Sequence, residues 1–314
     1  MKALILVAAL LGAGPAAAQY PTKPIRVLVP FGAGSSTDIV MRILAQPLGQ
    51  SLGQPVVVEN KPGADGAIAA AEVVKAPADG YTVLLGTNSP MSAGPHLRKV
   101  PYDAISDFTP ISLVGNYTFF VLVHPSVPAR TLQELIAYAK ANPGKLNYAT
   151  GNTSAIVMTA MLASQAGMQF VHVPYKSEPP AITDLLSGNI HLMISSYATV
   201  APHMREGRLR PLVTTLPNRT SLMPDVPSIV EAGFPKFSVS PWAGMFGPAR
   251  MPKDVTERLN RELNALVKRA DVRESLLRQA FDPKGSTLEE FNAYVKDQYE
   301  IWGKAIREAG IQPE

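Results

Sequence analysis

The chain has 314 residues, of which 46% are hydrophobic and 17% charged, so its length predicts two globular domains and its composition excludes a disordered chain. Its 29 lysines and arginines against 25 acidic residues leave a formal net charge of +4, which gives no electrostatic footprint for a nucleic-acid partner. Cysteine is absent and no two of the five histidines lie at i,i+4 spacing, which excludes disulfides and cysteine chemistry and predicts neither a metal site nor a cofactor.

Residues 1–18 have the organisation of a cleavable signal peptide. Lys2 supplies a positive charge, an apolar run follows over 3–13, and the small residues Ala16 and Ala18 form a cleavage site. The run is shorter than the roughly 20 residues that cross a bilayer; a buried N-terminal helix is the alternative reading. We expect cleavage after Ala18, export from the cytoplasm and, without a cysteine at the cleavage site, no lipid anchor.

The next segment alternates short apolar runs with runs of helical spacing. Strands are predicted over 24–31, 55–58 and 81–85, and helices over 39–48 and 66–74. Such alternation is typical of βαβ units and predicts a parallel sheet.

A second alternating set begins near Val121. Its first helix, 132–141, starts at a capping box formed by Thr131 and Glu134 and ends before a Pro-Gly pair. Further strands and helices follow: strands over 146–149, 170–173, 190–194 and 209–214, and helices over 155–165, up to Gly188 and up to Gly207. This set is long enough to build a second sheet.

The C-terminal segment is predicted to be helical, with no strand between its helices. One helix has a single apolar face, formed by Val255, Leu259, Leu263, Leu266 and Val267. Another begins at a capping box of Thr287 and Glu290, and its apolar face contains Leu288, Phe291, Val295 and Trp302. We infer two α/β lobes that the chain crosses near 110–121 and again near 235–245. The first lobe comprises 19–120 and 241–314, and the second 121–240.

Four turns that follow predicted strands share one composition. They lie at 32–37, 86–89, 150–154 and 195–199, are rich in Gly, Ser, Thr and Asn, and contain no acidic residue. In open parallel sheets ligands bind beyond the carboxyl ends of the strands, and a helix N-terminus offers free N–H groups and about half a positive charge. The alternative for each turn is a simple helix cap. Four similar turns favour a site where neutral groups hold a small anion.

Signals for catalysis are weak. There is no Gly-x-Ser-x-Gly nucleophile elbow, and His124, His172 and His191 lie in or beside strands, where a structural role is favoured. The Gly-x-Gly beginning at Gly32 lacks the third glycine of a dinucleotide fingerprint, which argues against a nicotinamide cofactor. Four aromatic residues near the crossings either line a pocket or pack in the core: Tyr117, Phe119, Phe120 and Trp242.

A series of motifs spans nearly the whole chain after the signal peptide: YPTKPIR (20–26), GQPVVVENKPG (53–63), ADGYT (78–82), PYD (101–103), PGKL (143–146), HVPYK (172–176), TDLLSG (183–188) and LMPDVPS (222–228). In sequence and order this series resembles the Bug-type receptors, the periplasmic solute-binding proteins of the tripartite tricarboxylate transporter family.

The resemblance implies a two-lobed Venus-flytrap fold, type II-like, with two mixed sheets flanked by helices and a hinge between the lobes. It implies no enzymatic activity, a periplasmic location, membrane permease subunits as partners and a monomer that captures a small carboxylate: a dicarboxylate, an aromatic acid such as terephthalate, or an acidic amino acid. Together with the four turns it predicts these ligand-binding residues: Phe31, Gly34, Ser35, Ser36, Thr87, Asn88, Ser89, Gly151, Asn152, Thr153, Ser154, Tyr175, Asp184, Ser195, Ser196 and Tyr197.

The chain departs from the family pattern at two turns. Ser35 stands where the family usually has a second glycine, and Ser177 replaces the usual glycine after the HVPYK block. Glu178 follows, and at the mouth of the pocket it would disfavour an additional negative charge on the ligand. This points away from a tricarboxylate and toward a smaller or partly aromatic acid.

Two alternatives to a transport receptor remain. An orphan sensor would present the closed lobes to a two-component signalling protein, and the sequence does not separate it from a transport receptor. An exported enzyme would need an activated nucleophile, which the motifs do not supply.

Overall fold

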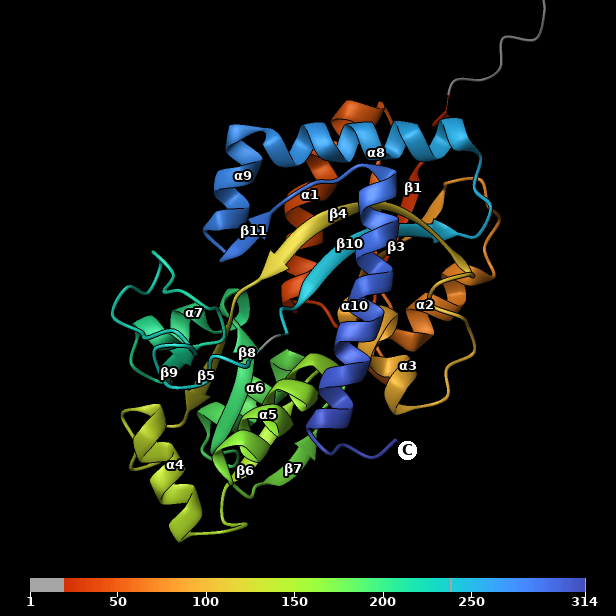
Figure 1. Ribbon diagram of the computed structural model, residues 1–314. Helices are drawn as coiled ribbons and strands as arrows, with labels where there is room; N and C mark the ends of the chain where they lie inside the picture. Colours follow the sequence, from red (N-terminus) through yellow and green to blue (C-terminus); the bar gives the residue numbers. More distant parts are fainter. Residues whose placement is uncertain (1–19, 238, 314) are drawn as a thin grey trace, which may run out of the picture.

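The structure, a computed structural model, describes residues 20–237 and 239–313. The predicted signal peptide, residues 1–18, lies outside the described residues. Figure 1 shows two lobes, each with a central sheet covered by helices. The predicted α/β architecture with two mixed sheets is confirmed.

The sheet of the first lobe has six strands. They are β1 (Ile25–Val29), β2 (Val56–Asn60), β3 (Thr82–Thr87), β4 (Phe108–Tyr117), β10 (Trp242–Pro248) and β11 (Phe281–Pro283), in the order β11-β4-β10-β3-β1-β2. β1 runs parallel to β2 and β3, whereas β10 runs antiparallel to β3 and β4, and β11 antiparallel to β4. The chain therefore returns from the second lobe into the middle of this sheet.

The sheet of the second lobe has five strands. They are β5 (Phe119–Val123), β6 (Asn147–Thr150), β7 (Val171–Pro174), β8 (Leu192–Ser196) and β9 (Arg210–Thr214), in the order β7-β6-β8-β5-β9. β6 is parallel to β7 and β8, and β5 is antiparallel to β8 and β9. The carboxyl ends of β6 and β8 therefore lie at the same edge, where two of the predicted turns begin.

Helices cover both sheets. Those of the first lobe are α1 (Ser36–Leu52), η1 (Ala64–Gly66), α2 (Ala67–Val74), the π-helical η2 (Ser89–Ala93), α3 (Gly94–Leu97), α8 (Lys253–Lys268), α9 (Ala270–Leu277) and α10 (Leu288–Glu308). Those of the second are α4 (Leu132–Ala141), α5 (Thr153–Ala166), α6 (Glu178–Leu186) and α7 (Tyr197–Arg205). In Figure 1, α10 runs from the first lobe to the second, where it packs against α5.

One sequence expectation about strands is wrong. A strand does separate the C-terminal helices, because β11 lies between α9 and α10 and pairs with β4. The parallel pairing predicted for the first three strands is present, and β10 enters the same sheet in the opposite direction, which makes it mixed. β11 has only three residues, one of them Pro283, and β10 is buried along its whole length, so neither shows the alternation that marks a half-buried strand.

The two predicted capping boxes, at Thr131 and Thr287, lie at helix starts, but only one of them has both reciprocal hydrogen bonds. At α10 both reciprocal hydrogen bonds of Thr287 and Glu290 are present. At α4 the Thr131 hydroxyl accepts from the Glu134 N–H, while the Glu134 carboxylate accepts from the N–H of Arg130. At α1 the Ser35 hydroxyl accepts from the N–H of Asp38, and the Asp38 carboxylate accepts from the N–H of Gly34 in the preceding loop.

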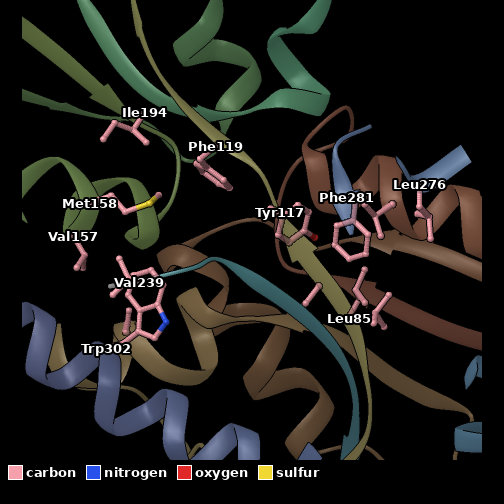
Figure 2. Packing of buried hydrophobic residues seen from close by; sticks show 14 of the residues in the cluster. Leu85, Tyr117, Phe119, Val157, Met158, Ile194, Val239, Leu276, Phe281 and Trp302 are labelled. Carbon is pink, nitrogen blue, oxygen red and sulfur yellow. The ribbon is translucent and has the colours of Figure 1, made fainter. Parts of the chain in front are cut away.

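The first crossing between the lobes is a single residue, Thr118. Its N–H donates to the carbonyl of Ala280 in the first lobe (3.1 Å), and its carbonyl accepts from the N–H of Tyr197 in the second (2.9 Å). Figure 2 shows its neighbours Tyr117 and Phe119 pointing into the packed interior on either side of this crossing. The residue boundaries of the lobes given above remain a proposal.

Among the described residues, no helix combines the length and apolar character needed to cross a membrane. The same residues contain no cluster of three or more histidine, aspartate or glutamate side chains arranged to hold a metal ion.

Asp38 ties the first predicted turn to the sheet. Its buried carboxylate accepts from the N–H of Gly34 (2.9 Å), the Arg42 guanidinium (3.0 Å) and the Asn60 amide (3.0 Å), and Asn60 also donates to the carbonyl of Phe31. Burial acts to raise the pKa of Asp38, but the hydrogen bonds from Arg42, Gly34 and Asn60 outweigh it and hold the pKa below its usual value. The charged form is therefore the one that the folded state stabilises.

Asp38→Asn is expected to lower the free energy of unfolding at pH 7 by about 1.5–3 kcal/mol, the range for hydrogen bonds to a charged group. Because the folded pKa is depressed, this stabilisation is present above the unfolded pKa of about 3.9 and is lost as the pH falls through the lower folded value. Urea unfolding at pH 7 and pH 3 should thus show a difference at pH 7 that shrinks at pH 3. Glu289→Gln, an exposed first-turn substitution in α10, is the control; equal stability of Asp38→Asn and the parent at pH 7 would contradict the role.

Candidate functional site

A cavity lies between the two lobes, at the ends of strands from both sheets. Its walls are formed by Phe31, Ser35, Ser36, Thr37, Thr87, Asn88, Ser89, Tyr117, Phe119, Gly151, Asn152, Ser154, Glu178 and Pro241. Three of the four predicted turns meet there. Those after β1 and β3 come from the first sheet, and the one after β6 comes from the second sheet, across the gap. The volume is about 20 Å³, close to the minimum that holds one water molecule.

The wall of the first lobe is built on the N-terminus of α1. Ser35 caps this helix, and Ser36 and Thr37 form its first turn. The hydroxyl of Thr37 accepts a hydrogen bond from Tyr117 (3.2 Å), which fixes both groups against the hinge. The first turn of α1 therefore presents its N–H groups and hydroxyls toward the cavity from a rigid base.

The wall of the second lobe is built on the N-terminus of α5. Asn152 caps the helix by accepting from the N–H of Ala155 (2.9 Å), which leaves Ser154, itself 3% exposed, facing the first lobe. Gly151 lies against the start of α6: a Cβ at this position would stand 2.4 Å from the backbone nitrogen of Glu178. Only glycine permits this close approach.

Hydrogen bonds join the two walls directly. The Asn88 amide donates to the Ser154 hydroxyl (2.6 Å), while its oxygen accepts from the N–H of Trp242 (3.2 Å) in its own lobe. The hydroxyls of Ser89 and Ser154 are 3.3 Å apart. The structure is thus closed over its cavity, and a ligand larger than water requires the lobes to separate.

Glu178, which the sequence suggested at the mouth of the pocket, lies in the cavity wall and is 2% exposed. Its carboxylate accepts from the hydroxyls of Ser195 and Ser196. Burial raises the pKa of this carboxyl, and hydrogen bonds from serines counteract the shift without cancelling it. The departure from the family pattern at this position was the signal that marked it.

Several predicted ligand-binding residues lie outside the cavity lining. The Tyr175 hydroxyl donates to Asp184, and the Tyr197 hydroxyl accepts from Arg205. The predicted residues absent from the lining are Gly34, Thr153, Tyr175, Asp184, Ser195, Ser196 and Tyr197. The lining residues outside the predicted ligand-binding set are Thr37, Tyr117, Phe119, Glu178 and Pro241; of these, Tyr117 and Phe119 were expected to line a pocket or to pack in the core, and Glu178 to lie at the pocket mouth.

No lysine, arginine or histidine is found among the lining residues that the structure describes. The ionisable groups there are Glu178 and Tyr117, and burial, with a contribution from the charge of Glu178, raises the pKa of Tyr117. The hydroxyl of Thr87 is buried and has no hydrogen-bond partner within the described chain. The site thus offers neutral donors to a ligand beside one carboxyl, that of Glu178.

Comparison with known proteins gives consistent matches. The family described as "Tripartite tricarboxylate transporter family receptor" matches residues 40–311. The chain is 35% identical to Protein BugT of Bordetella pertussis over 96% of this chain and 94% of that protein. It superimposes on an R. palustris structure with adipate (30% identity, TM-score 0.91, 94% and 100% coverage) and on MatC of Rhodopseudomonas palustris with bound malate (28% identity, TM-score 0.87, 91% and 100% coverage).

Gly151→Ala is expected to destabilise the protein by about 1–3 kcal/mol, the usual range for overpacking, because its methyl group would collide with the backbone of Glu178. Denaturant unfolding followed by circular dichroism measures the loss. Gly32→Ala is the matched control, since its methyl group would meet a side chain and no backbone: the Ser177 hydroxyl at 3.1 Å and its Cβ at 3.6 Å. Equal stability of both variants would show that the close approach at Gly151 is unimportant.

Proposed function

Because this chain belongs to the tripartite tricarboxylate transporter receptor family, we propose that it captures a small organic acid outside the cytoplasm and delivers it to the permease subunits of such a transporter. The family consists of solute-binding receptors and not of enzymes. A periplasmic location and a monomeric state belong to the same proposal.

One observation supports this function most strongly. Two helix N-termini, those of α1 and α5, come from opposite lobes and border a single cavity lined by uncharged donors. Each N-terminus carries free N–H groups and about half a positive charge, which favours an anion. An acid that contacts both can make its full set of hydrogen bonds only when the lobes are closed.

Binding would therefore shift the protein toward the closed form. A ligand moves such an equilibrium only by its difference in affinity for the two states. Here the donors are divided between the two lobes, so a ligand contacts all of them only in the closed state. In the open form the Asn88 to Ser154 contact breaks, and both side chains become available to a carboxylate. The closed form would be the one that the permease recognises.

The ligand class proposed is a small carboxylate. Relatives of this chain have been solved with adipate and with malate, which are both dicarboxylates. An aromatic acid such as terephthalate and an acidic amino acid belong to the same proposal, because the neutral donors recognise a carboxylate and not the rest of the molecule.

A thermal-shift screen of mono-, di- and tricarboxylates, aliphatic and aromatic, tests the proposal. A ligand present at 100 times its dissociation constant adds about 2.7 kcal/mol of stability, which such a screen detects. Stabilisation by at least one organic acid supports the proposed function, and no stabilisation by any of them at millimolar concentration argues against it.

Ser154→Ala is expected to weaken binding of the acid identified in that screen by about 1 kcal/mol or more, as for a lost hydrogen bond to a charged group. Ser35→Ala should do the same from the opposite lobe. Isothermal titration calorimetry measures both. Ser187→Ala, an exposed serine of the same lobe as Ser154, is the control. Affinity unchanged in both site variants would place the ligand elsewhere.

A further inference from the structure

Glu178 is a buried carboxyl in the wall of the binding cavity whose described hydrogen-bond partners are all neutral. One oxygen accepts from the Ser195 hydroxyl (3.1 Å) and the Ser196 N–H (3.2 Å). The other accepts from the hydroxyls of Ser196 (3.0 Å) and Thr199 (3.4 Å), and from that of Ser36 (3.3 Å) in the opposite lobe. The fully buried Glu178 carboxyl thus lies at the N-terminus of α7 and reaches that of α1.

These contacts use up donors that the sequence had assigned to the ligand. The turn after β8 holds the protein's own carboxyl, and Ser36 in the first turn of α1 contributes its hydroxyl and its backbone N–H to it. The donors left for a ligand carboxylate are Ser35 at the N-terminus of α1, those at the N-terminus of α5, and Asn88 and Ser89. The cavity therefore combines one position suited to an anion with one position taken by a carboxyl of the protein itself.

The two positions are neighbours. Ser154, in the first turn of α5, and Glu178 line the same small cavity, and the Glu178 carboxylate accepts from the Ser36 hydroxyl of the opposite lobe. A ligand whose carboxylate binds at the first turn of α5 inside this cavity therefore has its adjacent atoms near the carboxyl of Glu178. A second carboxylate placed there would meet a like charge in a poorly solvated site, whereas a positive charge would be attracted.

We propose that Glu178 determines specificity, and that this receptor selects a zwitterion whose carboxylate binds at the N-terminus of α5 while an ammonium or other cationic nitrogen pairs with Glu178. An α-amino acid has this arrangement of charges. The inference rests on the proposed function and narrows its ligand class, since it disfavours acids that lack the nitrogen.

Titration calorimetry with matched probes tests it on the mature full-length protein. Each pair differs in the nitrogen alone: L-alanine and propionate, L-aspartate and succinate, L-phenylalanine and 3-phenylpropionate. In at least one pair the amino acid is expected to bind at least tenfold more tightly than its partner. Glu178→Gln should reduce that ratio tenfold or more, whereas Glu206→Gln, an exposed residue of the same lobe with the same change in charge, should leave it unchanged.

A second measurement needs no variant. Calorimetry of the parent protein in buffers of different ionisation enthalpy gives the number of protons exchanged on binding. The titratable group that faces the Glu178 carboxyl is Tyr117 on β4. The hydrogen-bond donors to this carboxyl from β8, α7 and α1 are hydroxyls and backbone N–H groups, which do not titrate near neutral pH. A zwitterion should bind without proton uptake, because its nitrogen compensates the charge.

The outcomes separate the two proposals. Tighter binding of an amino acid, lost in Glu178→Gln, supports both. A propionate, succinate or phenylpropionate that binds as tightly as its amino-acid partner, or an amino acid that binds with uptake of a proton, overturns the role of Glu178 and leaves the carboxylate receptor intact. If none of the six probes and no acid of the thermal-shift screen binds, both proposals fail.

Discussion

The function proposed for this protein requires that charge be held between its lobes without a cationic side chain in the described cavity lining. The described lining contains serines, threonines, asparagines and backbone N–H groups, and the N-termini of α1 and α5 supply partial positive charge. Neutral donors cost less to desolvate than lysine or arginine when the lobes close. They are also useful only in one geometry, so binding depends on the relative position of the lobes.

The fold fixes that geometry at its crossing. Thr118 is hydrogen-bonded to Ala280 in one lobe and to Tyr197 in the other, so its backbone is held by both sheets. Tyr117, beside it, reaches Thr37 in the first turn of α1. The hinge is therefore bonded directly to the helix whose N-terminus forms one wall, and a rotation at the hinge moves this wall as a unit. Contacts of α10 with α5 provide a second connection on the other side (Figure 1).

Local patterns in the sequence predicted most of this architecture. The capping boxes at Thr131 and Thr287 mark real helix starts, and the alternating segments correspond to β1 to β3 and β6 to β9. The sequence failed where pairing is non-local: β10 is buried on both faces and has no periodicity, and β11 exists only because β4 offers it an edge. At the site, composition identified the turns, but not which hydroxyls would be committed to a neighbouring side chain.

Because these hydroxyls are bonded to Glu178, a single residue can change which ligand the fold shared by this family binds. The N-terminus of α7 attracts an anion by the same physics as those of α1 and α5, and Glu178 supplies the anion from within the chain. A turn that would otherwise be free to bind a second ligand carboxylate thereby becomes a negative surface held in place by hydroxyls. Because the scaffold and the other donors are unaffected, the charge pattern accepted by the cavity can be inverted at one end by a single side chain, and family membership alone does not fix the ligand.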